Sequence, residues 1–246
     1  MYYQEFKPSP LLAQYVHSYW VSSKGKSSRI LPDGLVDVIF NFGKATSTLP
    51  YWNAGVVGMM TKFRDVTIDK GTELIGIRFR PMHFHKWSKV SLNELKNITV
   101  QASDINSNWD HQLVAQIYQQ GTIQDKLAFI EHNLLATIDE TPLSRSPIIS
   151  SVCNAISTSF TGLSLSTIAK DHYISLRQLE RLFKAQVGVS MKEYQSIIRF
   201  IHTLKNLTQY PNKSLLHLAY DMGYFDHAHL TQEIKKVAGI PPSQLK

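Results

Sequence analysis

Four charged side chains in the C-terminal part of the chain recur at the spacing of one helix face. They are Arg177, Glu180, Arg181 and Lys184, at positions i, i+3, i+4 and i+7. Arginine can bind the O6 and N7 edge of guanine through two hydrogen bonds, and glutamate can accept one from N4 of cytosine. The simpler alternative is that these side chains only pair with one another in solvent, worth about 1 kcal/mol or less. The pattern therefore raises nucleic-acid recognition as a hypothesis.

The segment that carries these charges has the signals of a short helix. An apolar stripe at helical spacing occupies its other face and comprises Leu176, Leu179, Phe183 and Val187. Ser175 is a good N-cap residue, and Gly188 can adopt the positive φ that ends a helix. We expect a helix over 176–187 that buries the stripe and presents the charged face outward.

Positive charge is concentrated in the second part of the chain. The first 140 of the 246 residues hold 14 Lys and Arg against 13 Asp and Glu, whereas residues 141–246 hold 12 against 6. A basic part beside a nearly neutral part suggests that one of them faces a polyanion. Basic surfaces also serve solubility alone, so the charge leaves both interpretations open.

The remaining composition favours a cytoplasmic protein without disulfides. The single cysteine, Cys153, excludes a disulfide framework and a cysteine-rich zinc site. No apolar run approaches the ~18 residues that a membrane helix needs. Residues 1–12 lack the basic and then apolar order of a signal peptide. We expect no association with a membrane.

An internal repeat is the most specific feature of the sequence. Residues 164–194 align with residues 214–245 if the second copy has one extra residue. The matched pairs are Ser164 with Ser214, Ile168 with Leu218, Ala169 with Ala219, Leu179 with Leu230, Phe183 with Ile234 and Gly188 with Gly239. Each copy predicts a short helix, a tight turn, an N-cap (Ser175 or Asp226) and a second helix that is presented outward. This is helix-turn-helix geometry, and the small alanine lets the two helices cross closely.

A continuous helical pattern over 191–210 joins the two copies and ends at Pro211. About 17 helical residues would extend roughly 25 Å. A rigid spacer of this size can hold two recognition helices about one turn of DNA apart, about 34 Å.

The first hundred residues have the alternation of β-strands. In 35–42 the positions Val36, Val38, Phe40 and Phe42 alternate with Leu35, Asp37, Ile39 and Asn41, and in 74–81 Ile75, Ile77 and Phe79 alternate with Arg78 and Arg80. Gly and Pro residues punctuate the region. We predict a mainly antiparallel, barrel-like sheet.

Two amphipathic helices are predicted within 103–138, broken at Gly121. Their apolar stripes are Trp109, Leu113 and Ile117 in the first, and Leu127, Ile130 and Leu134 in the second. We expect this helical pair to pack on its own domain; a dimer seam is the less favoured alternative.

A stretch with two prolines and no periodicity, residues 136–151, separates the two parts. The predicted domains are a β-rich regulatory or dimerisation domain at 1–138, a linker at 139–147, and an all-α domain at 148–246. The predicted fold class of the chain is α+β.

Signals for a metal or for phosphate-loop chemistry are weak. His83 and His85 could share a metal on an extended strand, but Pro81 favours a helical turn in which the two rings lie about 200° apart. Residues 43–48 contain Gly-Lys without the full spacing of a phosphate loop. We predict no metal and no cofactor.

The alternative function that the residues leave open is a small-molecule-binding or catalytic barrel with a helical appendage. Arg78 and Arg80 could bind an anionic ligand inside such a barrel, although a solvated strand face is the simpler interpretation. No sequence motif of a nucleophilic or metal-dependent hydrolase occurs. We therefore predict that the chain is not an enzyme.

The C-terminal part resembles the AraC family of bacterial transcription regulators over about residues 148–246. The resemblance rests on the tandem repeat, the LxRLFK core at 179–184, a connecting helix with Arg199, and the segment 222–245. The N-terminal half is similar to a poorly characterised domain found in a subset of that family. The resemblance implies double-stranded DNA as partner, a small-molecule effector or a homodimer through residues 1–138, RNA polymerase contact if the protein activates, and a place at the bacterial nucleoid.

The resemblance also implies site residues. The base-contacting positions fall on Arg177, Glu180 and Arg181 in the first recognition helix and on His227, Ala228, Thr231 and Gln232 in the second. Candidates for phosphate contacts are Ser175, Lys184, Lys235 and Lys236. No effector-binding residue is assigned.

Two features of the chain depart from this pattern, and a third argues against one specialised branch of the family. The second helix has Gln232 and Ile234 where the family usually has Arg and Phe, so its contacts with bases should specify less. Tyr173 stands where a glycine is common, and we expect this turn to adopt another conformation, because positive φ costs a non-glycine residue about 1 kcal/mol or more. A methyl-accepting repair sensor would need a reactive thiol, but Cys153 lies in an apolar helical stretch and is expected in the core.

Overall fold

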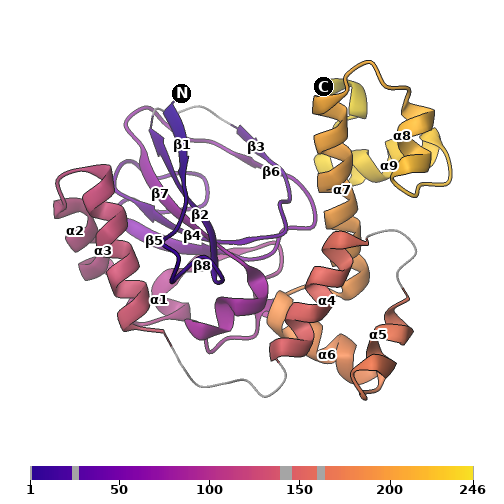
Figure 1. Cartoon of the computed structure of the whole chain (residues 1–246). Helices are drawn as coiled ribbons and strands as arrows, with labels where there is room; N and C mark the ends of the chain where they lie inside the picture. Colours follow the sequence, from indigo (N-terminus) through magenta and orange to yellow (C-terminus); the bar gives the residue numbers. More distant parts are fainter. Residues whose placement is uncertain (1, 24–27, 139–145, 160–163, 246) are drawn as a thin grey trace.

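The structure, a computed structural model, describes residues 2–23, 28–138, 146–159 and 164–245 (Figure 1). The strands are β1 (Tyr2–Phe6), β2 (Val16–Ser23), β3 (Ser28–Ile30), β4 (Val36–Asn41), β5 (Asn53–Val57), β6 (Arg64–Val66), β7 (Glu73–Phe79) and β8 (Thr99–Gln101). The helices are η1 (Pro81–Lys86), η2 (Leu92–Leu95), α1 (Ala102–Ile105), α2 (His111–Gln119), α3 (Ile123–Ala136), α4 (Ser146–Thr158), α5 (Leu165–Asp171), α6 (Leu176–Val187), α7 (Met191–Gln209), α8 (Leu215–Asp221), α9 (His227–Ala238) and η3 (Pro242–Gln244). A β-rich part precedes a helical part, which confirms the predicted fold class.

The N-terminal part is built on an antiparallel sheet of six strands in the order β1-β2-β7-β4-β5-β8, with β3 and β6 paired separately. The predicted alternation is confirmed, because Val36, Val38 and Phe40 of β4 and Ile77 of β7 are all buried in the core. In the register of the two strands Asp37 stands opposite Arg78, and both belong to the other face of the sheet.

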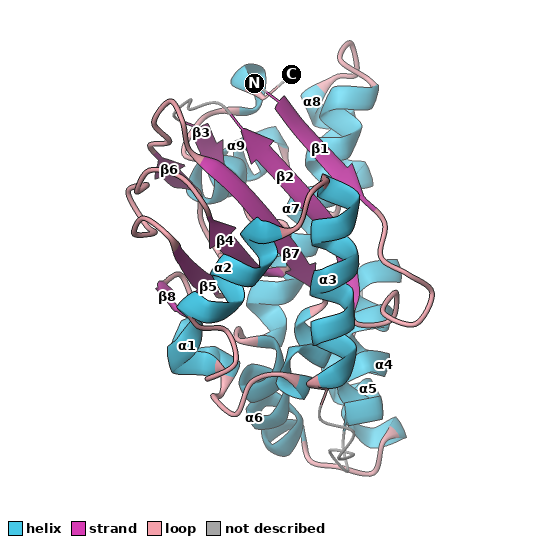
Figure 2. Cartoon of the chain, turned by 90° about the vertical axis from the view of Figure 1, so that its left-hand side faces the viewer, coloured by secondary structure: helices cyan, strands magenta, loops and turns pink. Residues whose placement is uncertain are grey.

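Helices α2 and α3 cover the core face of this sheet, as Figure 2 shows. The stripe residues Leu113, Ile117, Leu127, Ile130 and Leu134 all belong to the same buried cluster as the strands. The predicted helical pair and its packing on its own domain are therefore confirmed. The first helix of the pair begins later than predicted, at His111, because Asp110 caps it by accepting a hydrogen bond from the Leu113 backbone N–H.

The helical part contains the two predicted helix-turn-helix units, α5–α6 and α8–α9, joined by α7. Ser175 and Asp226 cap α6 and α9, and Ala169 and Ala219 are buried where each pair of helices crosses. The apolar stripe of α6 is buried except for Leu176 in the first turn, which is 38 % exposed, contrary to the prediction. The core of the unit begins one turn further along, at Leu179.

The two parts of the chain pack directly against each other, as Figure 1 shows for the sheet and α7. Met59 and Met82 belong to the buried cluster of the first helix-turn-helix unit. Gly34 lies against Ile197, Ile198 and Ile201 of α7.

Further contacts join the N-terminal part to the C-terminal ends of the recognition helices. The Ser91 hydroxyl donates to the carbonyl of Ala185 in α6 at 3.3 Å. The Phe63 backbone N–H donates to the carbonyl of Val237 in α9 at 2.7 Å. The boundary between the parts lies mostly outside the described residues: of the predicted linker 139–147, residues 139–145 are not described, and α4 begins at Ser146.

The turn between α5 and α6 keeps the conformation of its repeat partner. Tyr173 has a φ of 54° and Gly223 in the second unit has a φ of 70°. The expectation that Tyr173 would force another turn conformation was wrong. The helix N-cap at Ser175 and the buried Ala169 hold the chain on both sides, so the turn accepts the steric cost of the tyrosine Cβ.

Replacing Tyr173 tests this strain. The left-handed conformation costs an L-residue about 1–2 kcal/mol, and glycine loses about 0.4–1 kcal/mol through its freer unfolded chain. The side chain is 97 % exposed, so its removal costs little packing. We expect the free energy of unfolding, measured by chemical denaturation, to be about 1 kcal/mol higher for Tyr173→Gly than for Tyr173→Ala. Equal stability of the two variants would show that the turn is not strained.

Candidate functional site

The charged face of α6 is exposed as predicted. Arg177, Glu180, Arg181 and Lys184 all have exposed side chains, and Leu179, Phe183 and Val187 on the opposite face are buried. Ser175 is already engaged as the N-cap, since its hydroxyl oxygen accepts from the Gln178 backbone N–H at 3.2 Å. The structure thus brings the four predicted charges together on one outward surface.

The corresponding surface of α9 is less charged. His227, Ala228 and Gln232 are exposed, whereas Thr231 is partly buried and its hydroxyl donates to the carbonyl of His227 at 2.8 Å. Lys235 and Lys236 stand in the last turn, and the Lys236 ammonium lies 3.8 Å from the carboxylate of Glu233. Ile234 is fully buried and keeps the core contact predicted for it.

Helix α7 sets the separation of these two surfaces. Its 19 residues extend about 28 Å at the α-helical rise. Tyr194 near its start contacts Phe183 of α6 with ring centroids 5.6 Å apart, and Phe200 and Leu207 further along belong to the buried cluster of α9. Each recognition helix is therefore packed on a different part of one rigid helix.

Two exposed aromatic side chains lie beside the recognition helices, and the sequence analysis assigned neither of them to the site. Tyr173 is 97 % exposed and Phe225 is 83 % exposed, and each precedes the N-cap of its recognition helix by one or two residues. A large aromatic residue inside the turn of a helix-turn-helix repeat was the available signal. Arg199, by contrast, is a structural residue, since its guanidinium lies over the ring of Tyr224 at 5.0 Å and donates to the carbonyl of Gly223 at 3.3 Å.

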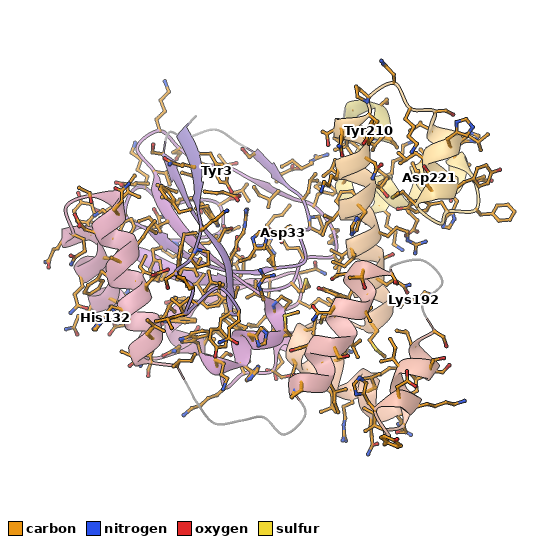
Figure 3. All side chains as sticks on the ribbon, in the orientation of Figure 1. Tyr3, Asp33, His132, Lys192, Tyr210 and Asp221 are labelled. Carbon is orange, nitrogen blue, oxygen red and sulfur yellow. The ribbon has the colours of Figure 1, made fainter. Side chains whose placement is uncertain are left out.

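The N-terminal part carries a second candidate site, a cavity of about 390 Å³ on the face of the sheet opposite the core. Strands β2, β4 and β7 form its floor, and β3, β6 and the loop at residues 31–35 enclose it. Its charged residues include Asp33, Asp37 and Arg78, and Figure 3 shows Asp33 on the side of the sheet that faces α7. Arg78, for which a solvated strand face was predicted, lies instead in the cavity wall with its side chain 21 % exposed.

Burial and crowding of carboxylates shift the ionisation of this cluster. Burial first, and the charge of Asp33 second, raise the pKa of Asp37 to about 8, against the opposing effects of Arg78 and Trp20. The side chain of Asp33 is 44 % exposed, and its carboxylate accepts a hydrogen bond from the Leu35 backbone N–H at 3.0 Å. Burial alone would raise the pKa of Glu5 as well, but the Tyr3 hydroxyl and Arg78 outweigh it and lower that pKa.

The free energy of unfolding should depend on pH through the protonation of Asp37. Its pKa is 3.8 ordinarily and about 8 in the fold, so between these values the folded chain keeps a proton that the unfolded chain releases. Stability from this group is complete below about pH 4 and falls as pH rises toward 8. Asparagine imitates the protonated carboxyl and does not titrate.

We therefore expect Asp37→Asn to gain stability over wild type as pH rises from 4 to 8, by at most about 1.4 kcal/mol per pH unit. Urea unfolding of both proteins at several pH values measures the difference. Because the charges of Asp33 and Asp37 act on each other, the difference between the two proteins reports this pair of carboxyl groups and not Asp37 alone. A difference that does not vary with pH would contradict the assignment.

The other candidates of the sequence are structural in this fold. Cys153 is fully buried, and burial raises the pKa of its thiol to about 12, so it has the core position expected of it. Pro81 begins the helical turn η1, as predicted. Burial lowers the pKa of His83 to about 4, and its ring packs edge-on against Tyr15. In the described part of the chain, no three His, Cys, Asp or Glu side chains gather as metal ligands would.

The sequence matches two family models. Residues 168–246 match a helix-turn-helix domain (HTH_18), and residues 4–101 match a domain of unknown function, DUF6597. No protein of curated function matches the chain significantly. Among the described residues, no helix has both the length and the apolar character needed to span a bilayer.

Solved structures were compared with the chain, and one of them, ToxT, reproduces the fold over nearly the whole chain. ToxT from Vibrio cholerae is similar over 99 % of this chain and 97 % of its own, with 10 % identity and a TM-score of 0.51. The C-terminal domain of AraT, a response regulator from Geobacillus stearothermophilus, matches 42 % of this chain and 85 % of its own, with 24 % identity and a TM-score of 0.38. An AraC-type regulator from Chromobacterium violaceum matches 42 % of this chain and 93 % of its own, with 24 % identity and a TM-score of 0.39.

These findings agree with the tandem units, the outward charged helix and the resemblance drawn from the sequence. The alternative of a catalytic barrel with a helical appendage is not favoured. Residues 168–246 are a helix-turn-helix domain of the AraC type, preceded by a DUF6597 domain, and the chain is a DNA-binding transcription regulator.

Proposed function

We propose that the two recognition helices read two adjacent segments of the major groove. The observation that carries this proposal is the pair of exposed N-terminal halves of α6 and α9, both mounted on the single helix α7. The contacts with the N-terminal part lie at the opposite, C-terminal ends of both helices, at Ala185 and Val237. The surfaces that would enter the groove therefore stay open.

The first recognition helix carries the greater share of sequence specificity in this proposal. Arg177, Glu180 and Arg181 contact bases there, and a bidentate arginine on guanine discriminates by about 1–3 kcal/mol. In the second helix, His227, Ala228, Thr231 and Gln232 face the bases with no permanent charge. The hydroxyl of Thr231 already donates within its own helix, which leaves its oxygen to accept. Ser175, Lys184, Lys235 and Lys236 contact phosphates.

Selection from random DNA tests the order of the two helices. We expect two blocks of conserved bases about 10 bp apart, the sharper one contributed by α6. Arg181→Ala should relax one or two positions of that block by about 1–3 kcal/mol, and Arg181→Lys should relax them too, because lysine lacks the bidentate fork. His227→Ala and Gln232→Ala should cost less.

Circular dichroism of each variant should match wild type, since these side chains are exposed. A selected DNA motif that is not divided into two blocks would contradict the proposal that the two helices contact two separate segments of the groove. If Gln232→Ala proves more damaging than Arg181→Ala, the order of the two helices is reversed.

The proposed phosphate contacts predict the salt dependence of binding. Each neutralised phosphate contributes about −0.9 to the slope of log K against log salt. Lys184→Gln should therefore make the slope less steep by about 0.9 and weaken binding to selected and scrambled DNA equally. Lys44→Gln, an exposed lysine in the N-terminal part, is the charge-matched control and should leave the slope unchanged. Equal slopes for wild type and Lys184→Gln would remove Lys184 from the interface.

We further propose that the N-terminal part regulates DNA binding and performs no catalysis. Its cavity supports control by a small-molecule effector, and residues 1–138, with the linker at 139–147, form the regulatory domain of a DNA-binding module at 148–246. A homodimer through this domain and contact with RNA polymerase are the partners that an activator of this architecture would use. The protein would act in the cytoplasm, at the nucleoid.

A further inference from the structure

The turn of each helix-turn-helix unit presents one exposed aromatic side chain. Tyr173 between α5 and α6 is 97 % exposed, and Phe225 between α8 and α9 is 83 % exposed. They precede the N-caps of the recognition helices, Ser175 and Asp226, by two residues and by one. Burial of a large apolar ring would stabilise the fold, so at both places the folded chain forgoes that gain.

Neither ring is needed to build its turn, because the same two backbone hydrogen bonds close both turns. From N–H to carbonyl they join Tyr173 to Lys170 at 3.0 Å, Ile174 to Ala169 at 3.1 Å, Gly223 to Tyr220 at 3.1 Å and Tyr224 to Ala219 at 2.8 Å. Gly223 takes in the second copy the place that Tyr173 takes in the first, and Phe225 is the one residue by which the second copy is longer. Each unit thus forms its turn without the aromatic residue of the other.

Tyr173 is also held in an unfavourable backbone conformation. Its φ of 54° lies in the left-handed region, which glycine adopts without strain and a residue with a Cβ does not. Residues kept in such conformations cluster at sites that bind ligands. The strain and the exposure together indicate a contact outside the chain.

The backbone on which each ring stands is fixed. Ile174, directly after Tyr173, packs against the core of the first unit. Tyr224, directly before Phe225, is 5 % exposed, and the Phe225 N–H donates to Nδ1 of His229 at 3.2 Å. A ring presented from a fixed backbone loses little conformational freedom when it binds, which favours its use as a contact.

Both turns lie where a docked helix-turn-helix unit meets the DNA backbone. The first helix of such a unit crosses the sugar–phosphate backbone, and the N-terminal residues of the second contact base edges in the major groove. The turn that joins them therefore passes over the backbone at the edge of the groove. Lys170 and Arg177 flank Tyr173 with exposed cationic side chains, which favours a phosphate there. The exposed carboxylate of Asp171 offsets only one of these two charges.

We propose that Tyr173 and Phe225 contact the sugar–phosphate backbone at the edges of the two major-groove segments. The Tyr173 hydroxyl donates a hydrogen bond to a phosphate oxygen, and the ring of Phe225, which has no polar atom, packs against a deoxyribose. The proposal rests on the groove docking proposed above and adds two contacts to it. Contacts of this kind fix the position of the helices on the duplex and carry no base information.

Fluorescence anisotropy of the full chain on two duplexes tests these contacts. One duplex carries a selected site and the other a scrambled site of equal length. Tyr173→Phe removes only the hydroxyl and should weaken binding to both duplexes about fivefold, because a hydrogen bond to a charged acceptor is lost. Phe225→Ala should weaken both by roughly threefold or more, because apolar contact area is lost. Tyr51→Ala, at an aromatic residue 62 % exposed in the N-terminal part, is the control and should bind both duplexes as wild type does.

The salt dependence distinguishes these contacts from those of the basic side chains. Neither Tyr173→Phe nor Phe225→Ala changes the charge of the protein, so the slope of log K against log salt should equal that of wild type. A loss confined to the selected duplex would assign the two rings to bases and overturn the proposal. Affinities equal to wild type in both variants would also overturn it and would leave the rings to a protein partner.

A variant that improves the turn separates DNA binding from stability. Tyr173→Gly relieves the strain of positive φ and should still bind both duplexes at least as weakly as Tyr173→Phe, because the hydroxyl is lost there too. Unfolding therefore does not account for its weaker binding. Wild-type DNA affinity in this variant would overturn the phosphate contact.

Photo-crosslinking measures the proximity directly. p-Benzoylphenylalanine introduced in place of Tyr173 or of Phe225 should crosslink to the bound duplex under ultraviolet light, and in place of Tyr51 it should not. DNA binding without a crosslink from position 173 or 225 would overturn the contact at that position. Absence of DNA binding by the wild-type chain would instead refute the groove docking proposed above, so the two failures are distinguishable.

Discussion

The packing of the N-terminal part on α7 and on the ends of both recognition helices is the contact on which the rest of the structure depends. Its contacts include Gly34 on the isoleucines of α7, Ser91 on the carbonyl of Ala185, and Phe63 on the carbonyl of Val237. Each meets a C-terminal end or the middle of a helix, where no base contact is proposed. The same contacts that fix the two helices relative to one another therefore leave their N-terminal halves accessible.

The close approach of the Phe63 ring to the end of α9 depends on a glycine. Gly239 follows α9 with a φ of 73°, and a Cβ at this position would lie 2.4 Å from the ring of Phe63. The residue that ends the helix thus also admits the aromatic ring that joins the two parts of the chain. Because Gly239 has no Cβ, it can both end the helix at positive φ and leave room for the contact between the two parts of the chain.

The position of the charged residues in the cavity follows from the sheet. One face of the sheet packs in the core, and the opposite face forms the floor of the cavity. Because side chains alternate along each strand, Asp37 and Arg78 lie opposite each other on the cavity face. A single arginine, Arg78, lies among the three carboxyl groups of Glu5, Asp33 and Asp37, and of these three only Asp37 is largely withdrawn from solvent. Because residues 31–35 also contact α7, the electrostatics of the cavity and the position of the DNA-binding part meet in one short segment.

Local sequence patterns were sufficient to predict the main helices and strands and the outward face of α6. Helix caps, the apolar stripe and the repeat are properties of near neighbours, so Ser175, Asp226, Ala169 and Ala219 took the positions predicted for them. Tertiary structure decided the rest. It held Tyr173 at positive φ because packing on both sides outweighs about 1 kcal/mol of strain. It also brought Asp33, Asp37 and Arg78 together from separate segments, which spacing along the chain does not encode, because strand pairing and the fold of residues 31–35 determine that distance.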